Sequence, residues 1–193
     1  MNTADRLLGT LIWVLAVLAI AGVTHIVTIL TLPAFASKDI YAWIGELAKP
    51  AQLGVEPHAQ PGSQLVPFAD PAIVQAVCPF DLSQGGLRLH ADVEGDRFLS
   101  LSFHTPQGKL FYALTDLAAR EGRIDIVVLT AQQLEAVEAD DDEENPSQDL
   151  RLLPPTLRGF VFINALADVL GEREEAERRV RSVSCGLEPI VEE

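Results

Sequence analysis

The sequence of 193 residues has few basic residues and few cysteines. Lysine and arginine number 14 against 28 acidic residues, which gives a formal net charge of -14. A nucleic-acid-binding protein needs basic residues to displace phosphate counterions, so this composition excludes a general nucleic-acid binder. Two cysteines are too few for a disulfide-rich scaffold. The hydrophobic fraction of 48% is too high for a disordered chain.

Sequence motifs for catalysis are also missing. The chain has no Walker loop, no GxGxxG after a strand, no HExxH, no CxxC and no GxSxG. The four histidines, at positions 25, 58, 90 and 104, do not have the spacing of metal ligands. We therefore expect no enzymatic activity, no cofactor and no metal.

Charged residues are absent from Leu7 to Ser37. Within that stretch Leu7–Leu32 is mostly Leu, Ile, Val and Ala, and as a helix it reaches about 39 Å, more than the roughly 30 Å of a hydrocarbon core. We predict a transmembrane helix at 7–32 after a cytoplasmic tail at 1–6. A signal peptide cut after Ala36 is the alternative, but the apolar run is about twice the usual length of a signal core.

The flanking charges indicate the orientation of this helix in the membrane only weakly. Arg6 precedes it and Lys38 and Lys49 follow it, so the positive-inside count is nearly balanced. The acidic residues that follow should avoid an anionic cytoplasmic leaflet. We expect a single-pass protein of the bacterial inner membrane, with its soluble domain in the periplasm.

Three threonines recur on one face of the predicted helix. Thr24, Thr28 and Thr31 are spaced by four and three residues, and His25 lies beside them. Each hydroxyl can bond to the carbonyl four residues earlier. Alternatively, these four residues form a contact surface for another membrane protein, because small polar residues let helices approach closely.

Residues 33–69 contain five prolines and predict a juxtamembrane helix followed by a linker. A short helix is expected within 38–48, with Tyr41 and Trp43 as an aromatic anchor at the membrane surface. Residues 49–64 are interpreted as a linker or as a strap on the domain surface.

The soluble domain, 70–193, has a pattern dominated by strands. Asp70 and Pro71 predict the start of a short helix that runs to Val77. Apolar residues alternate with polar ones at 87–93 and 97–105, which predicts two half-buried strands. Further elements are expected as a strand at 124–130, a helix at 131–137, strands at 149–153 and 158–165, and a helix at 172–183.

Hydrophobic alternation also suggests how three strands pair. A hairpin that opposes Leu89 to Leu101 keeps apolar residues together along the ladder. A second hairpin at Gln107–Gly108 opposes Phe103 to Tyr112, and the same register places Thr105 against Leu110. We predict an antiparallel meander of three strands.

The other face of that meander would carry a set of polar residues. The predicted pairing brings Arg88 and His90 close to Ser100 and Ser102, which suggests a shallow site for a small ligand. The alternative is a solvated face or a seat for a helix, since binding pockets usually combine convergent polar groups with an apolar cavity.

Acidic residues are concentrated at 135–149, where seven fall within ten positions. The run predicts a solvated loop, because like charges repel. The spacing lacks the alternating aspartates and closing glutamate of an EF-hand loop, so calcium is not expected.

Cys78 and Cys185 lie 107 positions apart, near the two ends of the domain. In an oxidising compartment such a pair predicts one disulfide, with two buried thiols as the alternative.

Several short segments together carry a family resemblance. They are Thr24–Thr28, Asp39–Ala42, Cys78–Leu82, Phe98–Phe103, Leu129–Leu134 and Arg158–Val161. The chain resembles a family of small single-span bacterial membrane proteins of unknown function, related to larger proteins with a jelly-roll-like carboxy-terminal β domain. Phe98-Leu99-Ser100 departs from the aromatic-Trp-Ser of that family. The resemblance implies no catalytic residue.

These observations combine into one expectation. The fold class is α+β or mainly β, with an amino-terminal transmembrane helix, an antiparallel β-rich sandwich or jelly-roll-like domain, and a carboxy-terminal helix. We expect a non-enzymatic envelope module that binds the lipid bilayer and another membrane protein. Small-ligand binding and a hydrolase-like activity are the alternatives.

Overall fold

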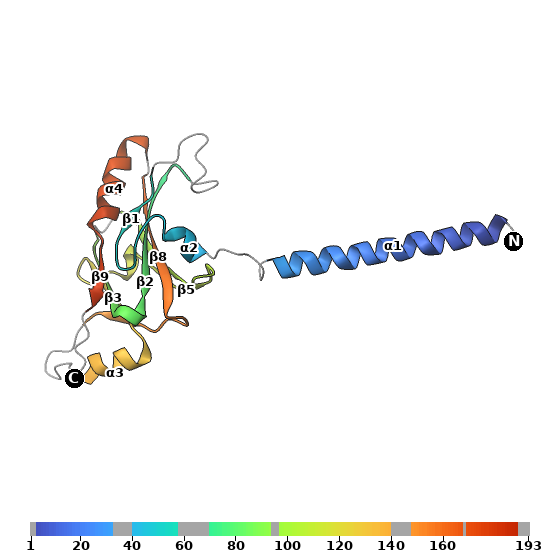
Figure 1. The fold of residues 1–193 in the computed structure, drawn as a ribbon. Helices are drawn as coiled ribbons and strands as arrows, with labels where there is room; N and C mark the ends of the chain where they lie inside the picture. The colour runs from blue at the N-terminus through green and yellow to red at the C-terminus, as the bar shows by residue number, and fades with distance from the viewer. Residues whose placement is uncertain are drawn as a thin grey trace. The chain divides into compact units, whose positions relative to one another are not determined.

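The computed structural model describes residues 3–32, 40–57, 70–93, 97–139, 148–167 and 169–188. The chain forms two compact units, Met1–Lys38 and Asp39–Glu193 (Figure 1). The first unit is the helix α1, Thr3–Thr31, and the second unit contains the sheets.

Helix α1 is long and apolar enough to cross a membrane. Its apolar part, Ala4–Thr31, has 28 residues, a mean hydropathy of 2.4, and no residue buried inside the protein. The helix begins four residues before the predicted Leu7, and Pro33 lies outside the described residues.

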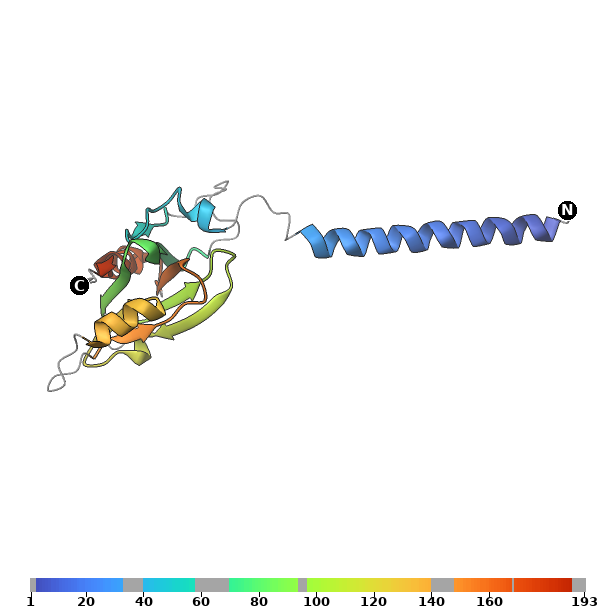
Figure 2. The same ribbon diagram turned by 60° about the horizontal axis from the view of Figure 1, so that its bottom comes forward.

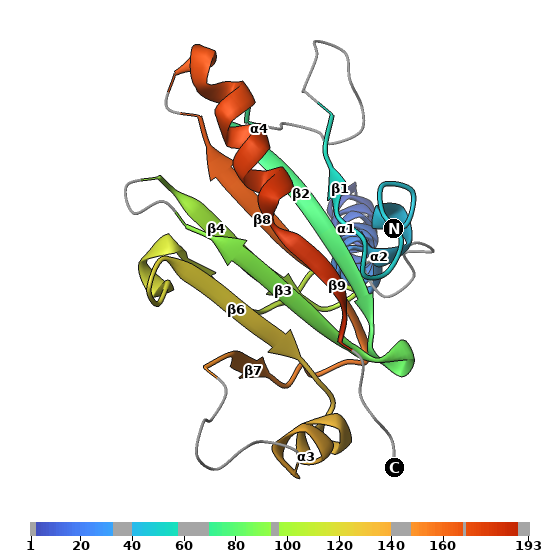
Figure 3. The ribbon, with the colours of Figure 1, turned by 90° about the vertical axis from the view of Figure 1, so that its left-hand side faces the viewer.

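The β-rich unit contains two sheets. Sheet A has the strand order β1-β2-β8-β4-β5 and sheet B has the order β7-β6-β3-β9 (Figure 3). Neighbouring strands are antiparallel, except that β6 and β7 are parallel. The strands are β1 Gly54–Val55, β2 Ile73–Asp81, β3 Gly86–Asp92, β4 Leu99–His104, β5 Leu110–Thr115, β6 Arg123–Val128, β7 Leu150–Leu152, β8 Arg158–Leu166 and β9 Ser184–Glu188.

Three short helices and three 3₁₀ turns complete this unit. The helices are α2 Ile40–Ile44, α3 Ala131–Ala139 and α4 Arg173–Ser182. The turns are Leu82–Gln84, Asp116–Ala118 and Leu170–Glu172. Helix α3 is separated from the helices α2 and α4 by the strands (Figure 2).

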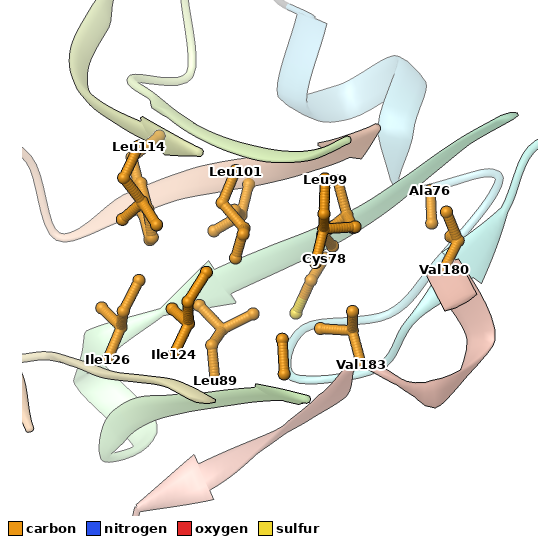
Figure 4. Packing of buried hydrophobic residues seen from close by; sticks show 14 of the residues in the cluster. Ala76, Cys78, Leu89, Leu99, Leu101, Leu114, Ile124, Ile126, Val180 and Val183 are labelled. Carbon is orange, nitrogen blue, oxygen red and sulfur yellow. The ribbon is translucent and has the colours of Figure 1, made fainter. Parts of the chain in front are cut away.

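The core lies between the two sheets. Alternate residues of each strand point inward, so Leu89 and Ile126 of sheet B face Leu101 of sheet A (Figure 4). Ile163 of β8 belongs to the same cluster. All four are fully buried. The apolar stripe predicted for the last helix is confirmed, because Ala176, Val180 and Val183 belong to the same cluster. This arrangement is the expected sandwich, in which each sheet covers the apolar face of the other.

The predicted pairing of β3 with β4 is wrong. Strand β3 pairs with β6 and β9 in sheet B, whereas β4 pairs with β5 and β8 in sheet A. Both strands alternate as expected, but alternation determines which side chains face the core and not which strand lies alongside. The three-stranded meander is therefore reduced to the hairpin of β4 and β5.

The register of that hairpin is largely confirmed. Phe103 lies opposite Tyr112 and Leu101 opposite Leu114, as predicted. The predicted pair Thr105–Leu110 is not formed, because the register shifts after Phe103 and places His104 opposite Leu110. An extra residue in β5, Phe111, accommodates this bulge.

The predicted helix at 70–77 is a strand. The Asp70 carboxylate accepts a hydrogen bond from the Ala72 backbone N–H at 2.9 Å, which is a turn rather than a helix cap. Strand β2 follows and carries Cys78 in its interior, so this cysteine does not precede the first strand as expected. Aspartate followed by proline is compatible with the start of a helix and with a turn before a strand. The strand forms here because β2 pairs with β8 along its whole length.

Helix α2 and the chain after it pack on the outer face of sheet A. Ile44 and Ala48 form a second cluster with Val77 and Phe160. Tyr41 contacts this cluster, and its hydroxyl donates a hydrogen bond to the Phe80 carbonyl at 3.2 Å. The aromatic residue that we expected at the membrane surface thus packs on the sheet. Strand β1 lies against β2, so the described part of the segment 49–64, residues 49–57, is a strap and not a free linker. Residues 58–64 lie outside the described residues.

The acidic loop predicted at 135–149 begins as a helix. Glu135 and Glu138 belong to α3, which ends at Ala139. Residues 140–147 lie outside the described residues. The helix predicted at 131–137 is thus confirmed and extends to Ala139, with the helix propensity of alanine, glutamine and leucine.

Candidate functional site

The predicted polar pocket is not formed, because its residues lie on opposite outer faces of the sandwich. Leu87 and Leu89 of β3 point into the core, so Arg88 and His90 point away from it on sheet B. The same alternation in β4 turns Ser100 and Ser102 outward on sheet A. The structure brings together Arg88 with His90, and Ser100 with Ser102, but not the two pairs.

Arg88 is held by two carboxylates. Its Nη2 donates to Glu188 Oε1 at 2.9 Å, its Nε also donates to Glu188, and Asp149 lies 3.6 Å away. The hydrogen bond to Glu188 raises the pKa of the Arg88 guanidinium above its ordinary value. This pairing joins β3 to the edge strand β9 and satisfies the charge within the protein.

His90 likewise faces carboxylates. Its Nδ1 lies 2.6 Å from Asp125 Oδ1, and its Nε2 lies 3.5 Å from Asp92 Oδ1. Both ring nitrogens are thus engaged, so His90 is not placed to act on Ser100. Among the residues that the structure describes, no group of three His, Cys, Asp or Glu side chains is arranged to hold a metal ion.

The two serines belong to a separate polar row on sheet A. Ser102 Oγ lies 3.0 Å from His104 Nε2, and His104 Nδ1 lies 3.2 Å from the Gly108 carbonyl. A carbonyl only accepts, so Nδ1 carries the proton and Nε2 accepts from the Ser102 hydroxyl. Ser100 accepts from Asn164 Nδ2 at 3.5 Å. The spacing of Ser102 and His104 by two residues on one strand was the available sequence signal for this pair.

The described part of the β-rich unit contains an edge groove of about 450 Å³. It lies between β5 of sheet A and β6 and β7 of sheet B. Its floor is apolar and its rim carries charges. The floor residues are Tyr112, Leu114, Ile124, Ile126 and Leu150. The rim residues used below are Arg120, Glu121, Arg123, Asp125 and Asp149.

The edge groove exists because the two sheets are not closed on this side. Strand β5 ends sheet A, and β7 ends sheet B. The inward faces of the outer strands therefore meet solvent instead of another strand. A groove of this volume, with an apolar floor and a few polar groups, has the character of a binding site.

The charges at the rim are largely paired. Asp125 faces His90, Asp149 faces Arg88, and Glu121 lies 3.8 Å from Arg123. Within the described residues, no hydrogen bond or ion pair engages the Arg120 side chain. Arg120 is thus the rim arginine without a counterion among the described residues, and an anionic group can pair with it, although the rim carries three carboxylates against two arginines.

The threonines of α1 bond within their own helix. Thr28 Oγ1 donates to the Thr24 carbonyl at 2.8 Å, and Thr31 Oγ1 donates to the Val27 carbonyl at 2.8 Å. For Thr28 and Thr31 this is the bond expected in the first of our two interpretations. A contact of Thr24, His25, Thr28 and Thr31 with another helix stays a prediction.

The structure joins Cys78 and Cys185 by a disulfide, as expected from the sequence. The bridge connects β2 of sheet A to β9 of sheet B, and the two Cα atoms lie 6.6 Å apart. It therefore links the two sheets directly.

Comparison with known proteins identifies structural neighbours only. No family model matches the chain, and no curated protein matches it significantly. The VPA0106 protein from Vibrio parahaemolyticus has a similar fold, with a TM-score of 0.55 and 8% sequence identity, over 79% of this chain. A putative uncharacterised protein from Burkholderia cenocepacia aligns with a TM-score of 0.42 and 12% identity, over 67% of this chain.

These neighbours are longer than the chain. The alignment covers 37% of the VPA0106 protein and 35% of the Burkholderia protein. The name of neither protein states an activity. Likeness at this level of identity concerns the fold alone, and it transfers no activity to this chain.

Proposed function

We propose that the chain is a single-pass protein of the bacterial inner membrane whose β-sandwich lies in the periplasm and binds another membrane protein without catalysis. The observation that carries this proposal is α1. Its span Ala4–Thr31 has 28 residues and a mean hydropathy of 2.4, and none of it is buried inside the protein. A helix that is apolar all round requires lipid or another protein around it.

The disulfide supports the periplasmic side. Disulfides form and persist in oxidising compartments and are rare in the bacterial cytoplasm. The Cys78–Cys185 bridge links the two sheets of the domain. A folded domain that uses such a bridge suits a compartment in which the bond is stable.

Membrane extraction and reporter fusions test this arrangement. After expression of the full chain, we expect it to resist extraction by alkaline carbonate and to keep its first residues. A carboxy-terminal alkaline phosphatase fusion should be active, and a fluorescent-protein fusion dark. The variant Leu15→Arg/Leu18→Arg should be released, since each arginine at mid-span costs about 3 kcal/mol. Recovery of soluble chain beginning at Ser37 would show that α1 is a cleaved signal instead.

The edge groove supports a binding role for the domain. Its apolar floor is formed by residues of the sandwich interior, among them Leu114 and Ile124. An apolar side chain of a partner can bury surface there without disturbing the fold. Rim residues Arg120 and Arg123 provide positive charge for an acidic partner residue.

Photo-crosslinking tests this role. We expect a photoreactive amino acid at Tyr112, on the groove floor, to capture one envelope protein in intact cells. The same amino acid at Gln132, on the exposed surface of α3, is the matched control. The substitution Thr24→Leu/Thr28→Leu should lower the yield if the helices also pair. Equal labelling of many proteins at both positions would contradict a specific groove.

The groove favours a second candidate function, the binding of a small amphipathic anion. Its volume lies in the range of small-ligand sites, and Arg120 offers a charge without a counterion. This hypothesis replaces the predicted site at Arg88 and His90. A medium-chain carboxylate should raise the melting temperature, and Arg120→Ala should abolish the rise while Arg158→Ala, on another strand, should not.

A further inference from the structure

The two sheets have four terminal strands, and three of them are poorly suited to pairing with another chain. Strand β1 has two residues, β7 has three and contains Arg151, and β9 carries Glu188 and is bridged through Cys185. Short strands and charged residues are devices that protect an edge against association.

Strand β5 lacks this protection. It ends sheet A with the six residues Leu-Phe-Tyr-Ala-Leu-Thr, which include no charge and no proline. Leu110 is 51% exposed, and Ala113 is also exposed. Residues of this kind favour strands, and an open edge offers backbone N–H and C=O groups to another strand.

We propose that β5 pairs with β5 of a second copy of this chain, in antiparallel orientation. A two-fold axis perpendicular to the sheet relates the copies and joins the two five-stranded sheets into one continuous sheet. Such an axis keeps the outer face outward in both copies. Residues that face each other across the two strands must point to the same face of the sheet. The two-fold axis must therefore pass through a residue and not between two residues, and the central residues of β5 are Tyr112 and Ala113.

Charges at the ends of β5 favour a second copy as the occupant. Lys109 immediately precedes the strand, and Asp116 immediately follows it. Antiparallel pairing brings Lys109 of each copy beside the end of the strand that carries Asp116 in the other. No hydrogen bond or ion pair between described residues engages either side chain. In the register centred on Tyr112, Lys109 lies opposite Thr115 and one position from Asp116 of the other copy, so the symmetry places two lysines next to two carboxylates.

A cysteine at the two-fold axis tests the pairing directly. Both native cysteines are in the disulfide, so Ala113→Cys introduces a single free thiol. In the full chain, in detergent or in membranes, a short bismaleimide should convert this variant to a covalent dimer. The control Gln132→Cys, on α3, should stay monomeric. A crosslink of Ala113→Cys only to a different protein would overturn self-pairing in favour of a foreign strand.

Charge exchange tests the register. Lys109→Glu should weaken dimerisation by roughly two- to thirty-fold in sedimentation, the range for two exposed ion pairs. Lys109→Glu/Asp116→Lys should restore it, and an intact disulfide in both variants shows that they are folded. Failure of the double variant to recover, or a monomer at every concentration of the wild-type chain, would overturn the proposal. Neither measurement depends on whether the domain is periplasmic.

Discussion

Reduction of the Cys78–Cys185 bridge should lower the stability of the sandwich strongly. The bridge closes a loop of 107 residues, nearly the whole of the folded domain. In the chain-entropy model, such a loop corresponds to about 4.7 kcal/mol, and measured values for native disulfides are about 2–5 kcal/mol. We expect the lost stability to fall in that range.

Apart from the bridge, few contacts hold strand β9 in the domain. Strand β9 is the terminal strand of sheet B, and in the described structure it pairs with β3 alone. Without the bridge, β9 is held by that pairing, by the bond of Arg88 to Glu188, and by the packing of Val183. The carboxy-terminal segment should therefore open first, and the loss should appear mainly as faster unfolding.

Thermal unfolding with and without a reductant is the assay. For a domain of this size, 1 kcal/mol corresponds to about 2–4 °C, so a decrease of roughly 5–15 °C is expected. The variant Cys78→Ala/Cys185→Ala provides the control, because its melting temperature should be low and insensitive to the reductant. A decrease below about 2 °C, or free thiols in the oxidised protein, would refute the reasoning.

Three further changes test the core and the electrostatics. Leu101→Ala should lose about 2–5 kcal/mol in urea unfolding, because Leu101 is fully buried between the sheets, whereas Leu117→Ala, at 91% exposed, should change little. Gly159→Ala should lose about 1–3 kcal/mol, because its Cβ would lie 2.4 Å from the His104 carbonyl oxygen, and a wild-type melting temperature would disprove that contact. Burial raises the pKa of Glu56 above 4.5, and the nearby Arg173 only partly offsets this, so Glu56→Gln should be more stable than wild type at neutral pH. That advantage should vanish as the pH falls below 4.5, where the carboxyl is protonated in both states, and a variant less stable at pH 7 would contradict it.

Local patterns predicted the elements of the fold well. Alternation placed β3, β4, β6 and β8 within a few residues, because one face of each strand must reach the core. The apolar stripe of α4 followed from helical spacing. The β4–β5 hairpin was also predictable from its matching apolar residues, although the predicted two-residue turn was wrong, because the Thr105 N–H bonds to the Lys109 carbonyl.

Pairing between distant strands was not predictable in this way. Strand β8 lies between β2 and β4, although more than 50 residues separate it from β4 along the chain. Many strands in this sequence have an equally apolar face, so the pattern gives no preference among partners. The choice depends on packing of the whole core.

The edge groove also could not be predicted from the sequence, because it depends on how distant strands pair. Its floor combines Tyr112 and Leu114 from sheet A with Ile124, Ile126 and Leu150 from sheet B. Each of these residues has the ordinary pattern of a core position. They line a groove only because β5 and β7 end their sheets on the same side.

The two sides of the sandwich differ in how firmly the sheets are joined. On the side of β2 and β9, the disulfide connects sheet A to sheet B, and α4 packs across β2 and β8. On the side of β5 and β7, the sheets are separated by the edge groove. A ligand or partner residue that enters there contacts edge strands, which have few neighbours, rather than the bridged side. The bridge thus allows the domain to keep its fold while its open edge adapts to a partner, which is the property that a binding module requires.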